Sequence, residues 1–238
     1  MSLATQVVSL PAVAAVVDDD ATAADYLTVL LEDAGIRSHV LLEGFKDIDA
    51  AITQIEGQAT AAVCDHRLSP RGYAQFSGAE LVARLYERRV PAILTTQFPM
   101  DADVSIRRWR ERIPVLISRN DLEPHSLTKG FEQCIAELRG EYTTERIARR
   151  TIVRIANRTS ENNEEVVDAF VPAWRLAEAV RFPLGLVDEQ VRDVVRAGAR
   201  LAAEVNVGAR HGSELFFRNF EAMADPPDDD AFSLLINS

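Results

Sequence analysis

The sequence predicts an α/β protein: a doubly wound sheet of five parallel strands, followed by a small, mostly β domain that is barrel-like. Two observations predict this class. From residue 12 to about 139, short apolar runs alternate with amphipathic stretches, which is typical of parallel strands joined by helices. Past Gly140 the apolar stretches show partial two-residue alternation and are broken by polar turns, which is typical of antiparallel strands.

Five apolar runs are expected to be strands buried on both faces, because they are short, rich in Val, Ile and Leu, and flanked by polar residues. They cover residues 12–17, 38–42, 60–64, 91–96 and 114–118. The helical stretches that alternate with them cover residues 21–35, 47–57, 77–89, 101–113 and 121–140. Gly35 and Gly57 are typical of helix C-termini. We expect the strand order 2-1-3-4-5.

The chain is expected to hold two domains and a tail. Residues 1–140 form the α/β domain and residues 141–225 the small β domain. Within the second domain, the stretch 188–198 has a helical pattern that stops at Gly198. Residues 226–238 are acidic and polar, and we expect them to be disordered.

Composition and charge exclude several classes of protein. The 238 residues carry a net charge of -11, which would repel phosphate backbones, so nucleic acid is not an expected partner. Cys64 and Cys134 lie far apart and no CxxC pair occurs, which excludes a disulfide framework and a zinc ribbon and fits a reducing compartment. No apolar run approaches the roughly 20 residues of a membrane span. We therefore expect a cytoplasmic protein that does not enter a membrane.

Acidic and hydroxyl side chains follow three of the predicted strands. After the first strand come Asp18, Asp19 and Asp20, at the end of the third Asp65, and at the end of the fourth Thr95 and Thr96. Because the carboxyl ends of neighbouring parallel strands meet at one edge of a sheet, we expect the acids of the first and third strands to converge. Converging carboxylates repel one another unless a cation neutralises them, and oxygen ligands of this kind suit Mg²⁺. A carboxylate beside Mg²⁺ can also attack phosphorus and form an aspartyl phosphate.

On these residues, the region from about 12 to 139 resembles the receiver domain of bacterial two-component response regulators, which has a flavodoxin-like fold. In that family an acidic pair follows the first strand, the phosphoaccepting Asp ends the third, and a Thr or Ser ends the fourth. Here Asp18 and Asp19 match the pair, and VCDHRLSP places Asp65 as the acceptor. The run PAILTT places the hydroxyl at Thr96, with Thr95 the neighbouring choice.

The resemblance implies a phosphoprotein of a two-component phosphorelay, and not an enzyme. Asp65 would take its phosphoryl group from a sensor histidine kinase or a phosphotransfer protein, and Thr96 would bond the new phosphoryl oxygen. Mg²⁺ would be held directly by Asp19 and Asp65, through water by Asp18, and by the backbone carbonyl of Arg67. The β domain, which has no helix-turn-helix signature, would signal to a downstream protein. The face made by the fourth helix, fifth strand and fifth helix is the candidate homodimer surface.

The sequence departs from the family's pattern near the predicted switch. The family has a Lys followed by Pro at the end of the fifth strand, whereas this chain has Ser-Arg-Asn, so Arg119 has to supply the positive charge. The strand 114–118 contains no aromatic residue that could follow a movement of Thr96. The loop after Asp65 is longer than usual, and Pro70 lies five residues beyond Asp65 instead of four. We expect intact acceptor chemistry with an altered or lost readout.

Three alternatives stay open at this point. In the first, the receiver is degenerate and acts as a phosphorylation-independent scaffold, because Arg119 replaces the Lys. In the second, the chain is a phosphatase of the haloacid dehalogenase type, because Asp18, Asp20 and Thr22 fit the spacing D-x-D-x-T after a strand. In the third, the run of acids is a solvated loop in which Asp20 or Thr22 caps the first helix.

Further side chains have both a structural and a functional interpretation. For Arg107, Arg108, Arg110 and Arg112, which surround Trp109, we expect a solvated helix face, with docking of an acidic partner as the alternative. His66 is a candidate for the site entrance. Few basic residues lie near the aromatic residues of the second domain, so we expect a core and not a base-stacking platform. They are Trp174, Phe182, Phe216, Phe217 and Phe220.

Overall fold

The structure, a computed structural model, describes residues 9–68, 72–97, 104–161 and 163–223. These residues divide into two compact units, which are described separately below. The first unit contains the chain up to Arg146 together with the segment Arg210–Glu214, and the second contains the rest. No described helix is both long and apolar enough to cross a membrane. Pro70 and the predicted tail 226–238 lie outside the described residues.

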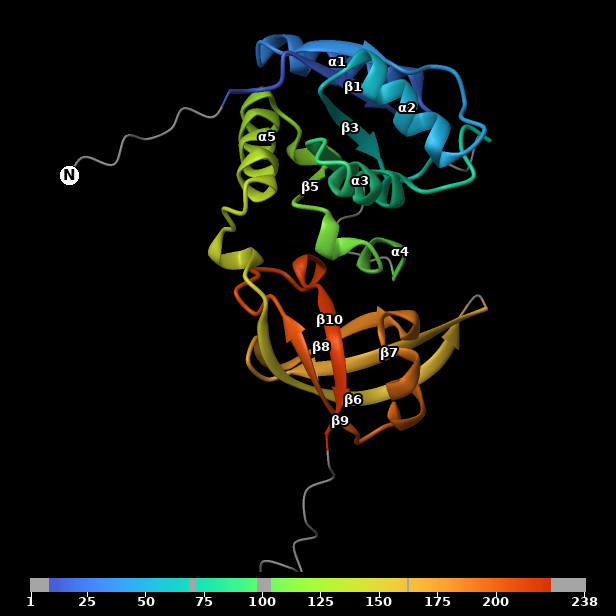
Figure 1. Cartoon of the computed structure of the whole chain (residues 1–238), viewed down its shortest axis with the longest axis vertical. Helices are drawn as coiled ribbons and strands as arrows, with labels where there is room; N and C mark the ends of the chain where they lie inside the picture. The colour runs from blue at the N-terminus through green and yellow to red at the C-terminus, as the bar shows by residue number, and fades with distance from the viewer. Residues whose placement is uncertain (1–8, 69–71, 98–103, 162, 224–238) are drawn as a thin grey trace, which may run out of the picture. The chain divides into compact units, whose positions relative to one another are not determined.

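The first unit is built on a sheet of five parallel strands in the order β2-β1-β3-β4-β5, which confirms the predicted fold class (Figure 1). The strands are β1 (Val13–Val17), β2 (Arg37–Val40), β3 (Ala61–Asp65), β4 (Ala92–Thr96) and β5 (Val115–Ser118). Strand β1 lies beside β3, and Val17 pairs with Cys64. The next residues on these strands, Asp18 and Asp65, therefore reach the same edge of the sheet.

The helices of this unit are α1 (Ala21–Asp33), α2 (Ile48–Gln58), α3 (Gly78–Glu87), α4 (Val104–Arg107) and α5 (Pro124–Leu138). Local sequence explains where three of them begin. The side chains of Asp20, Asp47 and Ser77 each accept a hydrogen bond from a backbone N–H in the first turn of α1, α2 and α3, respectively. The sequence left open whether Asp20 or Thr22 caps α1, and in the structure the cap is Asp20.

Strand side chains alternate between two apolar cores, because helices cover both faces of the sheet. Ala15 and Val17 of β1 belong to a core with residues of α2 and α3. Ala14 and Val16 belong to the other core, with residues of α1 and α5. This burial on both faces explains why the strands are continuous apolar runs. The charged side chains of the sheet lie at the strand ends, where the site is.

The predicted helix at 101–113 is wrong in its extent. In the described part, α4 ends at Arg107, and a separate 3-10 helix, η1 (Arg110–Arg112), follows. The backbone N–H of Trp109 bonds to the carbonyl of Ile106, three residues earlier, so the backbone leaves the α-helical pattern there. This stretch contains no Gly or Pro that would predict the break.

Two arginines of this stretch are buried, although the sequence predicted a solvated helix face. Arg107 donates to the backbone carbonyl of Gly212 at 2.6 Å, and Arg110 donates to that of Ser213 at 3.3 Å. Both carbonyls lie in the segment that belongs to the first unit. Burial lowers the pKa of Arg107 to about 10 and that of Arg110 to about 9. These two side chains are therefore structural donors and do not form a surface for an acidic partner.

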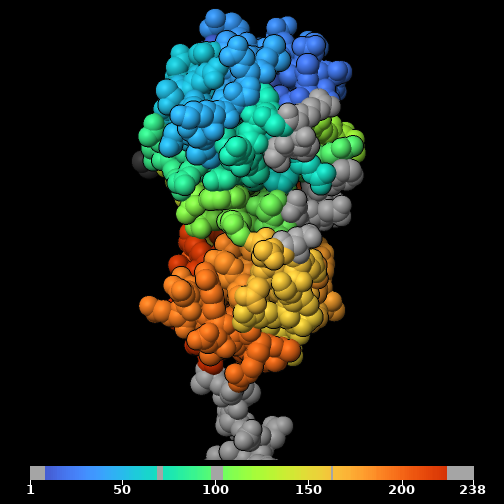
Figure 2. All heavy atoms as spheres, turned by 90° about the vertical axis from the view of Figure 1, so that its right-hand side faces the viewer, coloured from blue at the N-terminus to red at the C-terminus, as the bar shows by residue number. Residues whose placement is uncertain are grey.

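The second unit holds an antiparallel sheet, as the sequence predicts, and its strand order is β10-β9-β6-β7-β8. Its strands are β6 (Arg149–Glu161), β7 (Glu164–Val171), β8 (Arg175–Pro183), β9 (Arg200–Val205) and β10 (Phe217–Ala222). In the space-filling view the visible surface of this unit is coloured yellow to red (Figure 2). The helical pattern at 188–198 is a 3-10 helix, η5 (Glu189–Val194), because the N–H of Val191 bonds only three residues back, to Asp188.

One face of this second sheet packs on an apolar core. Phe182, Phe217 and Phe220 are buried in it, with neighbouring ring centroids 4.9 to 6.2 Å apart. Phe216 is also buried, and Trp174, half-buried, donates its indole N–H to the carbonyl of Ala209 at 2.8 Å. The aromatic residues are therefore core residues, as expected, and not a platform for bases.

Candidate functional site

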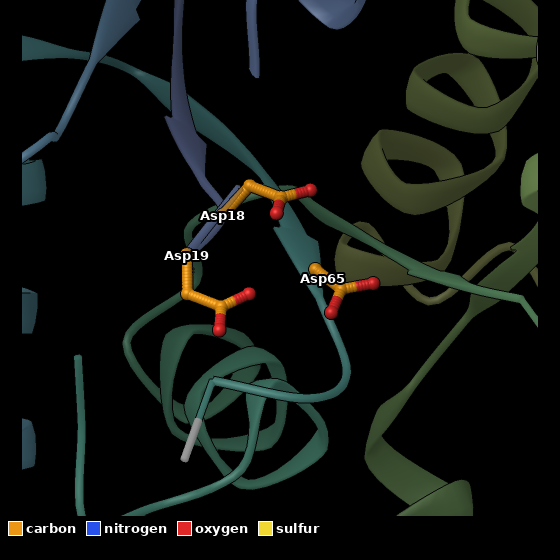
Figure 3. Close-up of side chains that lie close together, drawn as sticks. All are labelled: Asp18, Asp19 and Asp65. Atoms are coloured by element: carbon orange, nitrogen blue, oxygen red, sulfur yellow. The ribbon is translucent and has the colours of Figure 1, made fainter. Parts of the chain in front are cut away.

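Three carboxylates lie together where β1 and β3 end (Figure 3). Asp18 and Asp19 follow β1, and Asp65 is the last residue of β3. One oxygen atom of each lies within 4.8 Å of the other two. Asp18 and Asp65 are buried and Asp19 is half-buried. The acids that the sequence placed at one edge of the sheet are thus close enough to share one divalent cation.

Asp18 is a carboxylate held in a setting that disfavours its charge. Its pKa is raised to about 6, first by burial and also by the nearby charges of Asp65 and Asp19. Two donors oppose this shift: the backbone N–H of Asp20 at 2.9 Å and the guanidinium of Arg119 at 2.7 Å. An additional positive charge at this edge of the sheet would therefore stabilise the ionised form of Asp18.

Arg119, which follows β5, lies inside the carboxylate cluster. Its Nη2 atom is 2.7 Å from Asp18 Oδ2 and 2.9 Å from Asp65 Oδ1, and its Nε atom donates to the same Asp65 oxygen at 3.2 Å. Burial lowers the pKa of Arg119, but the attraction of Asp65 and Asp18 outweighs it, so the pKa lies above its ordinary value. One guanidinium therefore joins the ends of three strands, β1, β3 and β5.

The chain around Asp65 is fixed by its own backbone. Asp65 Oδ2 accepts the N–H of Arg67 at 2.8 Å, and the N–H of His66 donates to the carbonyl of Thr95 at 2.9 Å. Gly78, the first residue of α3, lies so close that a Cβ there would be 1.7 Å from the carbonyl oxygen of Asp65. Only glycine fits this position, and its lack of a side chain lets the start of α3 pack directly against the end of β3.

The two candidate hydroxyls at the end of β4 have different surroundings. Thr95 pairs with Asp65 in the sheet, and its Oγ1 atom donates to the carbonyl of Cys64 at 3.3 Å. Thr96 is the last residue of β4, is buried, and pairs with Ser118 of β5, the residue before Arg119. The hydroxyl of Thr95 is thus engaged by the sheet. Thr96 lies at the end of β4, the strand between β3, which ends at Asp65, and β5, which precedes Arg119.

His66 is buried beside the site and reaches α4. Its Nε2 atom lies 3.0 Å from the hydroxyl oxygen of Ser105. The sequence placed His66 at the site entrance. In the structure this side chain joins the loop after Asp65 to the first turn of α4.

Sequence reasoning missed the residues that brace the loops around the site. The hydroxyl of Tyr73 donates to the carbonyl of Leu41, and the N–H of Phe45 donates to the carbonyl of Tyr73 at 2.8 Å. The rings of Phe45 and Tyr73 meet edge to face at 5.3 Å. Burial raises the pKa of Tyr73, so its hydroxyl keeps its proton. The sequence signal was the pair of aromatic residues, Tyr73 and Phe76, in an otherwise polar loop.

Asp20 lies next to the cluster in sequence but has a different role. Its Oδ1 atom accepts the backbone N–H groups of Thr22 and Ala23 at 2.9 and 3.3 Å. The phosphatase alternative needs this carboxyl as a general acid. In the structure it caps α1 instead, so no contact of Asp20 described here favours that alternative.

No family model and no curated protein matches the chain. The solved structures similar to it include a response regulator receiver domain protein from Clostridium thermocellum, at 15% identity and a TM-score of 0.42, covering 54% of this chain and 97% of that chain. A putative response regulator from Chloroflexus aurantiacus is 23% identical, with a TM-score of 0.40, and the match covers 53% of this chain and 98% of that one. A CheY-like receiver domain protein from Methanospirillum hungatei is 18% identical, with a TM-score of 0.41 and coverage of 56% and 99%. The C-terminal region is not matched. The structures to which the N-terminal part of this chain is similar in fold are thus response regulator receiver domains.

Proposed function

We propose that the first unit is a receiver domain of a two-component response regulator and that Asp65 accepts a phosphoryl group. The observation that carries the proposal is the setting of Asp65: a buried carboxylate, two further carboxylates within 4.8 Å, and a guanidinium at 2.9 Å. Phosphoryl transfer needs a nucleophile, ligands for a cation and a fixed positive charge at one place. The edge formed by β1, β3 and β5 supplies all three.

The proposed reaction is a displacement at phosphorus. A carboxylate oxygen of Asp65 attacks the phosphorus of a phosphohistidine on a sensor kinase or phosphotransfer protein. As the new P–O bond forms, the P–N bond breaks and its electron pair stays on the imidazole nitrogen, which takes up a proton. The protein's part is to position the carboxylate and to neutralise charge. The N–H of Arg67, which bonds Asp65 Oδ2, holds the nucleophile in one orientation.

The donor set fits Mg²⁺, because hard oxygen ligands from three close carboxylates are what this ion prefers. Asp19 and Asp65 would hold it directly, Asp18 through water, and the Arg67 carbonyl would add a neutral ligand. When bound, the ion would offset the negative charge of the acids and of the incoming phosphoryl group.

Arg119 takes the place of the Lys that the family has at the end of the fifth strand. Its planar fork already spans Asp18 and Asp65, so it can keep one N–H on Asp18 while another turns to a phosphoryl oxygen on Asp65. Thr96, at the end of β4, is the proposed hydroxyl donor to that group. Phosphorylation would thus exchange one set of contacts of Arg119 for another.

We further propose that the second unit signals to a downstream protein, because its aromatic side chains form a core and its described residues include no element of a nucleic-acid reader. The cytoplasmic location and the homodimer surface on α4, β5 and α5 stay predictions from the sequence. Phosphorylation and the need for the ion are tested together by the experiment that follows.

The test uses the full chain and acetyl phosphate as the phosphodonor, with intact mass as the measurement. With Mg²⁺ the wild type is expected to gain the mass of one phosphoryl group, and chelation of the ion by EDTA is expected to prevent the gain. Asp65→Asn should abolish it. Asp20→Asn is the matched control, because Asp20 caps α1 outside the cluster, and it should keep the adduct. An unmodified wild type, or an adduct that persists in Asp65→Asn, would refute the proposal.

One observation favours a second candidate, the phosphorylation-independent scaffold. Arg119 already neutralises Asp18 and Asp65, which leaves less negative charge to attract an ion. If this candidate holds, Mg²⁺ will not shift the amide resonances of residues 18, 19 and 65. Arg119→Lys, which keeps the charge but loses the fork, is the informative variant. A gain of phosphorylation in it would show that the guanidinium blocks the acceptor.

A further inference from the structure

The second sheet has one open face on which arginines and carboxylates gather. Side chains of an antiparallel sheet alternate between its two faces, and cross-strand partners lie on the same face. Val153 and Ile155 of β6, with Leu201 of β9, are in the apolar core. The residues between them in the alternation, Arg154 on β6 and Arg200 on β9, therefore lie on the open face.

Most of the arginines on this face are neutralised by a carboxylate. Each forms an ion pair with a residue of another strand: Arg150 with Glu221 at 2.5 Å, Arg218 with Glu204 at 2.7 Å, and Arg181 with Asp168 at 2.8 Å. These three acids are thus already engaged by arginines. An arginine on this face without a carboxylate partner therefore differs from the others.

Arg154 and Arg200 are the exception. They are direct cross-strand partners, so two positive side chains stand opposite each other. Neither side chain forms a hydrogen bond or an ion pair with any residue that the structure describes. Ile155, next to Arg154, accepts and donates backbone hydrogen bonds to the β9 side, at Gly198 and Ala199. Arg154 and Arg200 thus occupy a non-hydrogen-bonded position, where opposite side chains come closest, with Cα atoms about 4.5 Å apart.

Like charges directly opposite on a sheet are unfavourable, and here no described carboxylate forms an ion pair with either side chain. An oxyanion between the two guanidinium groups would offset them, since planar guanidinium forks match the oxygens of a phosphate. We infer that Arg154 and Arg200 form a binding site for a small, phosphate-bearing ligand. The inference does not depend on the proposed function of the first unit.

The surroundings of the pair favour a small ligand over a nucleic acid. Phe170 of β7 is the partner of Arg154 on its other side, and Ile152 lies two residues earlier on β6; both are half-buried and lie on the same face. These apolar groups can hold the organic part of a ligand beside the phosphate. A long polyanion would also run over the engaged acids Glu221 and Asp168, and the whole chain is acidic.

The test is an NMR titration of the full chain with inorganic pyrophosphate and, separately, with ADP, in EDTA so that the acidic site of the first unit holds no divalent ion. Both are diphosphates, but only ADP has an organic part. Saturable shifts are expected in the side-chain Nε–H signals of Arg154 and Arg200 and in the amide of residue 170. Tighter binding of ADP would assign the site to an organic phosphate, and equal binding to the inorganic ion.

Arg154→Gln should weaken the binding of both probes about tenfold, because one charge-assisted contact is lost. Arg218→Gln is the matched control: it removes the same charge from the same face, but from an arginine engaged by Glu204, and should leave the affinity unchanged. An equal loss in both variants would show a general charge effect and overturn the inference. So would the absence of saturation in the wild type.

A last variant tests the competing occupant. Four acids that follow β10 in sequence and lie outside the described residues, Asp225, Asp228, Asp229 and Asp230, are replaced together by Asn. If these acids do not engage the arginine pair, the affinity for pyrophosphate should stay within about twofold, because salt screens exposed charges that make no direct contact. If binding occurs only in this variant, the pair belongs to the chain's own carboxylates, and the inference is wrong.

Discussion

The two units use charged residues in opposite ways. In the first, helices cover both faces of the sheet, and charged side chains such as Asp18, Asp65 and Glu137 are buried at strand ends or helix ends. In the second, one sheet face is open and carries its ion pairs there. This difference shows that burial, and not the number of ion pairs, decides how much stability is lost when one partner of an ion pair is removed. Water can replace the partner of an exposed charge but not that of a buried one.

The largest effect is expected at the buried ion pair of the first unit. Arg146 and Glu137 lie 2.8 Å apart with side chains 5% and 2% exposed. Glu137→Ala leaves the Arg146 guanidinium buried without its counter-charge, so we expect a loss of about 3 to 5 kcal/mol in the free energy of unfolding. Urea unfolding of the first unit measures it. Glu132→Ala, an exposed position on the same helix, should cost far less.

The two tryptophans make the measurement specific to each unit. Trp109 lies in the first unit and Trp174 in the second, and the chain has no others. Trp174→Phe therefore leaves a fluorescence probe of the first unit, and Trp109→Phe one of the second. If Glu137→Ala moved the transition seen by Trp174 as much as that seen by Trp109, the comparison of separate units would fail.

The second largest effect is expected at Gly78, where the fold of the first unit meets its site. A Cβ at this position would lie 1.7 Å from the carbonyl oxygen of Asp65, so either α3 or the end of β3 must move. We expect Gly78→Ala to cost about 3 kcal/mol and to shift the amide resonance of Asp65. Gly57→Ala is the control, because nothing lies within 4 Å of a Cβ there, and it should be neutral or stabilising.

The sequence predicted the strand order and the meeting of Asp18, Asp19 and Asp65 because both follow from local pattern. Continuous apolar runs show strands buried on both faces, and acids directly after such runs must lie at the carboxyl edge. Arg119 could be named as the nearby cation, but that its fork spans Asp18 and Asp65 depends on the packing of β5, which no local pattern encodes.

The failures of prediction have one physical cause. Arg107 and Arg110 are charged, so the sequence favoured a solvated helix, yet their donors satisfy backbone carbonyls of a segment about a hundred residues later. Such contacts are set by tertiary structure and override helix periodicity. The second unit shows the same limit at η5, where a helical pattern forms a 3-10 helix.

A smaller effect is expected at the cap of α1. This prediction distinguishes Asp20, an acid with a structural role, from the acids of the site. Asp20→Ala removes the acceptor of two first-turn N–H groups and should cost about 1 kcal/mol in the stability of the first unit. Thr22→Ala should cost much less, since Thr22 is exposed and is not the cap. Equal losses in the two variants would contradict this assignment.

The smallest effect is expected on the open face of the second unit. Arg150 and Glu221 lie 2.5 Å apart, but their side chains are 58% and 57% exposed, so water can replace either partner. Glu221→Ala should leave the urea midpoint reported by Trp174 unchanged within error in moderate salt, and any loss should emerge only at low salt, where screening is weak. The double variant Arg150→Ala/Glu221→Ala completes the cycle and should show no resolved coupling. A coupling as large as that of Arg146 and Glu137 would mean that the open face is covered in solution, and the contrast between the units would then have to be explained by something other than exposure to water.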